Sequence, residues 1–157
     1  MITLADLCHS DTAVARGLVN EPDDAQRAAL ERGLATVIPQ VEALVGSFKP
    51  SSGFRCLTLN TIVKGERDSR HMRGEAMDGR PLEMAIDDAF VRIAGSAIAY
   101  DQMILERKRN RDGSTSVWLH LGWSEPPRRQ ALRAELVDLE DGTTRKQYFT
   151  FTPRSRP

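Results

Sequence analysis

Apolar positions follow a helical spacing in the first half of the chain and a strand-like alternation in the second half. The clearest helical stripe recurs every three or four residues, as on a helix that packs on a core. It consists of Leu30, Leu34, Val37, Ile38, Val41, Leu44, Val45 and Phe48. Pro39 lies inside this stripe and lacks a backbone donor, so a kink or a short break is expected near it. Shorter helices are predicted over residues 4–8, over 10–17, after Arg55 and from Pro81, where a missing N–H costs nothing.

Strands are predicted mainly in the second half of the chain. A short strand is expected over residues 75–78, and residues 100–106 should pair with 117–123 around a charged tip containing an Asp-Gly turn signal. A last hairpin is expected from 135–139 and 147–151. Residues 49–53 and 64–74 look irregular. Helices early and strands late predict an α+β fold, with N-terminal helices packed on a small antiparallel sheet.

Bulk properties narrow the classes of protein that fit. The 157 residues suit one domain, predicted over 1–152, with a disordered tail at 153–157. Basic and acidic residues balance at 22 each, so no overall field favours nucleic acid, and no apolar run is long enough for membrane insertion. The N-terminus lacks the features of a signal peptide, which predicts synthesis in the cytoplasm. Cys8 and Cys56 are predicted to be free thiols.

Two of the three histidines suggest a metal site. His71 is followed seven residues later by Asp78, and His120 lies in an aromatic segment between Trp118 and Trp123. Two histidines and one carboxylate can hold a zinc ion and leave its fourth position open for water, as catalytic zinc requires. The same spacing also arises by chance in a chain rich in acidic residues, and nitrogen and oxygen ligands suit other first-row metals as well.

The residues around these histidines resemble the zinc D-alanyl-D-alanine carboxypeptidase family of peptidoglycan peptidases, which has the hedgehog/DD-peptidase fold. The first metal motif of that family is similar to Ser69-x-His71-x-x-Gly74-x-Ala76-x-Asp78, and its second to Trp118-x-His120. Residues 2–13, 52–63, 100–106 and 127–130 also look like segments of the family, so the resemblance extends over most of the chain.

The resemblance implies that His71, Asp78 and His120 bind Zn²⁺. A general base is also needed, and many relatives carry a glutamate three residues before the last histidine, where this chain has Val117. Glu106 is the alternative candidate, since it would face the 117–120 segment across the predicted strand pair. Alternatively, Glu106 is a solvated residue at the end of a strand, without a catalytic role.

Three further residues are candidate site residues. Arg55 is predicted to anchor a substrate carboxylate, although a surface salt bridge would also explain it. Ser69 could hydrogen-bond the substrate, orient His71 or cap a loop. Asp101 is predicted to support a metal-binding histidine through its second ring nitrogen.

The functional hypothesis is a zinc-dependent peptidase that cleaves peptidoglycan stem peptides, as a carboxypeptidase or an endopeptidase. The single-domain layout resembles phage-type enzymes, which act on the cell wall after release through a holin-type system or as part of a virion. The alternative is a non-catalytic zinc-binding domain with a structural or interaction role on the same fold. A hydrolase for another kind of peptide also fits the residues.

Overall fold

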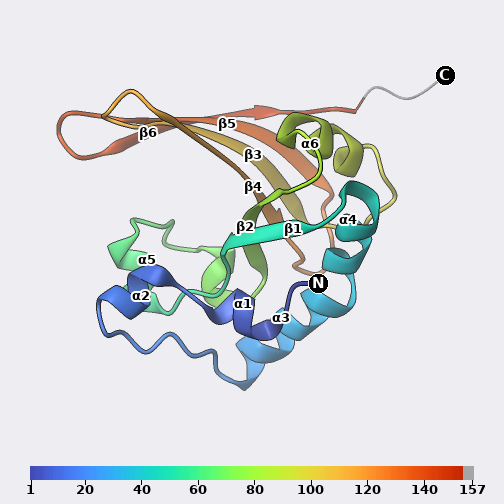
Figure 1. The fold of residues 1–157 in the computed structure, drawn as a ribbon, viewed down its shortest axis with the longest axis horizontal. Helices are drawn as coiled ribbons and strands as arrows, with labels where there is room; N and C mark the ends of the chain where they lie inside the picture. The colour runs from blue at the N-terminus through green and yellow to red at the C-terminus, as the bar shows by residue number, and fades with distance from the viewer. Residues whose placement is uncertain (154–157) are drawn as a thin grey trace.

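The computed structural model describes residues 1–153 (Figure 1). The N-terminal part contains α1 (Leu4–Cys8), α2 (Asp11–Ala15), α3 (Asp24–Ala35), α4 (Val37–Val45), β1 (Phe48–Ser52), α5 (Leu57–Ile62) and the 3₁₀ turn η1 (Arg70–Arg73). It is followed by β2 (Ala76–Pro81), α6 (Ile86–Ala94), β3 (Gln102–Arg109), β4 (Thr115–Gly122), β5 (Gln130–Asp138) and β6 (Thr144–Thr150). The α+β class is confirmed. All of the predicted tail except Pro153 lies outside the described residues.

The sheet is larger than predicted and is not purely antiparallel. Its six strands lie in the order β1-β2-β4-β3-β5-β6. All neighbouring strands are antiparallel except β3 and β5. The end of β4 lies beside the start of β3, and the chain crosses that end of β3 before β5 begins on its other side, so β3 and β5 run parallel. Alternation along a strand identifies its two faces but not its neighbours, which is why the sequence did not predict this order.

The helices cover one face of the sheet at one end, whereas the β3–β4 and β5–β6 hairpins extend past them (Figure 1). The main core joins residues of the helices to inward-facing strand residues, including Leu30, Val41, Phe90, Met103 and Leu119. The opposite face of the same strands carries a second, smaller apolar cluster. No helix in residues 1–153 is long and apolar enough to cross a bilayer.

The prediction of a break near Pro39 agrees with the structure, whereas the prediction made from Pro81 does not. The long helical stripe is broken into α3 and α4 at Thr36, so Pro39 falls in the first turn of α4, where its N–H would have no partner. The prediction of a helix starting at Pro81 was wrong. Pro81 instead ends β2, opposite Phe48, and α6 begins only at Ile86.

The segment at residues 49–53, predicted to be a loop, contains most of β1. Pro50 is compatible with this strand because β1 lies at the edge of the sheet, where one side of the backbone needs no ladder partner. The β1–β2 pairing shifts register between Pro50 and Ser52, and Ser52 lies opposite Asp78. This edge therefore brings the chain that leads to Arg55 next to the predicted metal ligands.

Candidate metal centre

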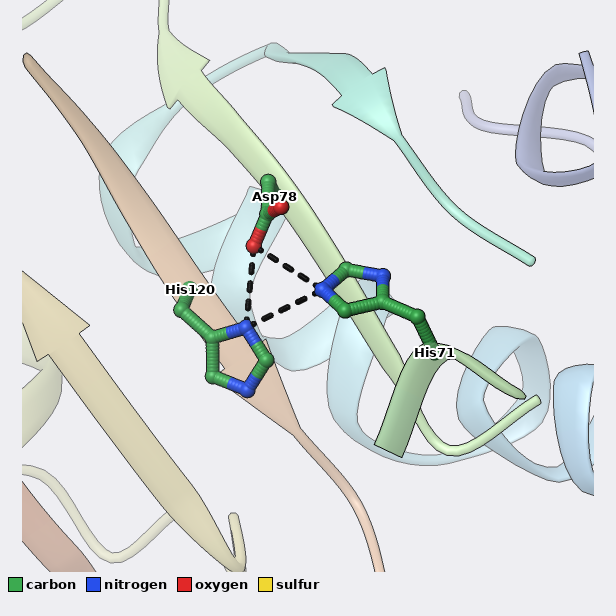
Figure 2. Close-up of side chains that lie close together, drawn as sticks. All are labelled: His71, Asp78 and His120. Atoms are coloured by element: carbon green, nitrogen blue, oxygen red, sulfur yellow. Dashed lines mark hydrogen bonds and ion pairs between the residues drawn. The ribbon is translucent and has the colours of Figure 1, made fainter. Parts of the chain in front are cut away.

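The side chains of His71, Asp78 and His120 converge on one point (Figure 2). His120 Nδ1 lies 2.9 Å from Asp78 Oδ1, and His71 Nε2 lies 3.1 Å from the same oxygen. The two imidazole nitrogens are 3.3 Å apart. All three side chains are buried, with residue exposures of 3% for His71 and 8% for the other two.

The sheet positions two of the three side chains directly. Asp78 on β2 and His120 on β4 are opposite each other in the antiparallel ladder, so their side chains leave the same face of the sheet. His71 comes from η1, outside the sheet, and its orientation is fixed by a 2.7 Å contact between Nδ1 and the Gly53 carbonyl. Because a carbonyl only accepts, Nδ1 carries the proton and Nε2 presents its lone pair to the other two residues.

This triangle fits a tetrahedral metal ion. Nitrogen and oxygen ligands bound to zinc at about 2.0–2.1 Å lie roughly 3.3 Å from one another, close to the three separations observed. Two neutral nitrogens and one carboxylate oxygen also form the mixed donor set of catalytic zinc sites, which leave one position open. His71, Asp78 and His120 would therefore hold the ion.

Two of the ligands are in the protonation state that metal binding requires. Burial lowers the pKa of His71, and this effect outweighs the pull of Asp78 in the other direction. Burial acts to raise the pKa of Asp78, but its interactions with His71 and His120 hold that pKa well below its usual range. Near neutral pH the site thus offers an ionised carboxylate and a neutral His71 imidazole.

Comparison with known proteins identifies the family. The model of the peptidase M15 family matches residues 1–111. The chain belongs to the peptidase M15 family. A search among curated proteins found no match. M15 peptidases are zinc metallopeptidases, and the match includes His71 and Asp78 but ends before His120. The structure adds His120, because β4 places it beside Asp78.

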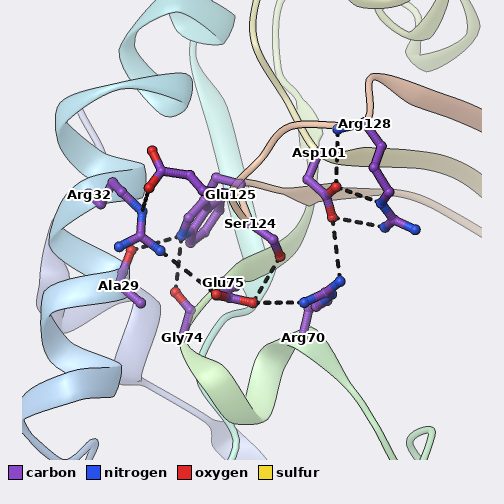
Figure 3. Close-up of polar contacts among 10 residues, drawn as sticks. Ala29, Arg32, Arg70, Gly74, Glu75, Asp101, Ser124, Glu125 and Arg128 are labelled. Atoms are coloured by element: carbon purple, nitrogen blue, oxygen red, sulfur yellow. Dashed lines mark hydrogen bonds and ion pairs between the residues drawn. The ribbon is translucent and has the colours of Figure 1, made fainter.

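The turn that carries His71 in this M15 peptidase is braced from two sides. The Met72 carbonyl accepts a hydrogen bond from Gln26 of α3, and the Gly74 carbonyl accepts one from the Trp123 indole. Arg70 bonds the Glu75 carboxylate at 3.1 Å, and Ser124 donates to the same carboxylate (Figure 3). These contacts hold η1 against the helices and the end of β4, so they keep His71 in place.

Gly74 ends this turn with a left-handed backbone, and we expect Gly74→Ala to weaken zinc binding as well as folding. Its φ is 69°, and an added Cβ would lie 2.3 Å from the Gln26 carbonyl oxygen. The matched control is Gly113→Ala, with φ of 83° but open space around the position, which should cost only the roughly 1–2 kcal/mol of a left-handed residue. Urea unfolding and zinc titration of both variants measure the difference. Equal losses in the two variants would contradict this role of Gly74.

The structure places Arg55 directly beside Asp78, one of the three candidate metal ligands. Its Nη2 donates to Asp78 Oδ2 at 2.7 Å, and its Nε donates to Ser52 Oγ at 2.9 Å. Asp78 therefore presents one oxygen to the histidines and the other to Arg55. Ser69, which precedes η1, makes no side-chain capping bond to it. Both Arg55 and Ser69 line the same cleft as the metal ligands.

Asp101 does not occupy the place expected for it. Its carboxylate accepts hydrogen bonds of 2.7 and 2.8 Å from the Arg128 guanidinium, and it lies 4.0 Å from Arg70 (Figure 3). No hydrogen bond among residues 1–153 joins it to His71 or His120. Asp101 instead fastens the 123–129 connection to the start of β3. The residue that supports a ligand nitrogen is Gly53, through a backbone carbonyl, which has no side-chain signature in the sequence.

Glu106 lies on the cleft side of β3, opposite Trp118 of β4. It is half-buried, and burial together with the negative charge of Asp78 raises the pKa of its carboxyl to about 7. Val117, the residue three before His120, packs instead against the main core. Glu106 thus lines the same cleft as the three converging residues, and its pKa suits proton transfer near neutral pH.

The cleft around these residues has a volume of about 930 Å³. The metal ligands, Arg55 and Glu106 all line it. It also includes residues that the sequence did not suggest, namely Leu136 and Asp138 of β5 and Lys146 and Tyr148 of β6. Alternation along β5 and β6 could have grouped these residues on one face, but only the strand order shows that this face adjoins Glu106.

Proposed function

We propose that this M15 metallopeptidase cleaves peptidoglycan stem peptides at a bond next to a D-amino acid, with Glu106 as the general base. The observation that carries the proposal is the presence of Glu106 in the same cleft as the His71–Asp78–His120 triangle. A metal site alone would suit a structural role. A carboxyl group with its pKa raised to about 7 beside that site supports hydrolysis.

In the proposed hydrolysis, the metal site and Glu106 have different roles. Bound at the three ligands, zinc would polarise the scissile carbonyl and lower the pKa of water. Glu106 accepts the proton of the attacking water and delivers it to the leaving amine. Its partial burial keeps the carboxylate poorly solvated, so it is a better base than an exposed glutamate.

Arg55 and Ser69 are proposed to position the substrate. Two of the N–H groups of Arg55 are used by Asp78 and Ser52, and the guanidinium has further donors that can bind a substrate carboxylate. Its contact with Asp78 also holds that ligand in orientation. Ser69 lies two residues before His71 on the cleft wall, where its hydroxyl can bond a substrate amide.

The choice of peptidoglycan stem peptides is supported by the resemblance of both metal motifs to the peptidoglycan peptidases. Access to the wall from the cytoplasm through a holin-type release system, or within a phage virion, is part of the same proposal.

Digestion of purified peptidoglycan tests the proposal directly. The metal-quantified protein is incubated with walls of several chemotypes, with and without a chelator, and the products are identified by mass spectrometry. We expect chelator-sensitive release of D-alanine or of cut stem peptides, and none from Glu106→Gln. Bound zinc without any product from these walls would instead indicate a binding domain.

A further inference from the structure

The cleft does not end at the metal ligands but continues across the sheet toward the β5–β6 hairpin. Strand register shows this as two rows of side chains on the same face. The first row is Asp78, His120, Ile104, Leu132 and Thr150, and the second is Trp118, Glu106, Ala134 and Tyr148. Glu106 therefore lies between the metal site and a surface formed by β5 and β6.

This surface is apolar close to Glu106. Ile104 and Leu136 belong to the small apolar cluster on this face, and Trp118 packs against it. Tyr148 stands at the edge of the surface with 47% of its area exposed. We call the part of the cleft lined by Ile104, Glu106, Leu136, Lys146 and Tyr148 the hairpin arm. An apolar floor with an exposed aromatic ring suits a peptide backbone and small aliphatic side chains.

The hairpin arm has a defined end. The loop after α5 reaches over to the hairpin, where Lys64 Nζ donates to the Gly142 carbonyl at 2.7 Å and Glu66 pairs with Lys146. From β3 to β6 there are two strand spacings, or about 10 Å, which is the length of roughly three residues of extended peptide. The arm is thus long enough for a short peptide segment, and the Glu66–Lys146 pair closes it at its outer end.

We propose that the hairpin arm binds about three substrate residues on one side of the scissile bond. Tyr148 then determines the preference for these longer peptides over a dipeptide. The inference rests on the proposed function, and it narrows the substrate class to peptides of at least four residues instead of free D-alanyl-D-alanine. The arm is built largely from β5 and β6, which lie outside residues 1–111 that match the family model.

Substrate length and one matched pair of variants test this proposal. Wild-type protein, Tyr148→Ala and Phe149→Ala are compared by kcat/KM on a synthetic stem pentapeptide and on the dipeptide. Phe149 is the control because it is nearly as exposed as Tyr148, at 46%. It lies opposite Arg133, one position along from the Ala134–Tyr148 pair, so its side chain is on the other face of the sheet from the cleft. We expect Tyr148→Ala to lose roughly tenfold on the pentapeptide, as for loss of a good aromatic contact, and Phe149→Ala to lose little.

A binding measurement separates failure of the arm from failure of the proposed function. Zinc-loaded Glu106→Gln, with and without Tyr148→Ala or Phe149→Ala, is titrated with the uncleaved pentapeptide by calorimetry. Weaker binding only in the Tyr148→Ala background supports the arm, even if wild-type protein cleaves nothing. Equal turnover of dipeptide and pentapeptide, equal effects of the two variants, or no pentapeptide binding at all would overturn it.

Discussion

His120→Ala is expected to abolish zinc binding and peptide hydrolysis together. The substitution removes one of three candidate ligand atoms that lie within 3.3 Å of one another, and it leaves only His71 and Asp78 to hold an ion. Loss of a residue that merely orients a ligand costs about 10–100-fold in metal affinity or activity. Loss of the ligand itself should therefore exceed that range. Metal content after dialysis and kcat/KM on a stem peptide are the two measurements.

His9→Ala is the matched control for this experiment. The His9 side chain is 62% exposed, pairs with Asp11 and is not one of the three converging residues. It should leave both zinc content and turnover unchanged. Stoichiometric zinc in His120→Ala would show that the protein holds the metal with other residues.

Glu106→Gln is expected to separate zinc binding from catalysis. The amide keeps the shape of the side chain but cannot accept the proton of the attacking water, and general bases typically contribute about 10²–10⁴-fold to the rate. Zinc content should stay at the wild-type level because Glu106 is not one of the converging ligands. Turnover measured on the same zinc-quantified sample tests both halves of the prediction.

The control variant is Glu135→Gln, which removes a carboxylate from the exposed side of β5. It should retain full activity. Wild-type turnover by Glu106→Gln would remove Glu106 from the mechanism and favour a base supplied by another group in the cleft.

Turnover should also fall as the pH is lowered, because Glu106 acts only when ionised. Its pKa is raised to about 7 by burial and by Asp78, and the positive charge of bound zinc acts in the opposite direction. The acidic limb of the kcat/KM profile is therefore expected at or somewhat below pH 7. A profile that stays flat down to the ordinary range of a glutamate would contradict this assignment.

The sequence pointed to the three residues that converge in the structure because their chemistry is visible in the residue types. Histidine is rare in this chain, with three residues in all, and the structure brings His71 and His120 together with Asp78. The partners of Asp101 and the carbonyl that supports His71 were not predictable in the same way. Both depend on which backbone segments meet in space, and a backbone carbonyl is the same at every residue.

The architecture was predicted only in part, for a related reason. Periodicity identified α1, the stripe of α3 and α4, and the strands of the two hairpins. It could not indicate that β5 lies parallel to β3, because face alternation carries no information on neighbours. The hairpin arm follows from that one pairing, which is why Leu136 and Tyr148 were not among the candidate residues.

Asp78 and His120 are directly paired across the β2–β4 ladder, and this pairing has a consequence for assembly of the sheet. Side chains alternate between the faces with a period of two, so a slip of one residue by β4 would turn His120 toward the main core and Leu119 or Leu121 into the cleft. Such a misaligned sheet cannot offer the three donors at once. Zinc present during refolding should thus capture only correctly aligned molecules, and metal content becomes a measure of strand alignment.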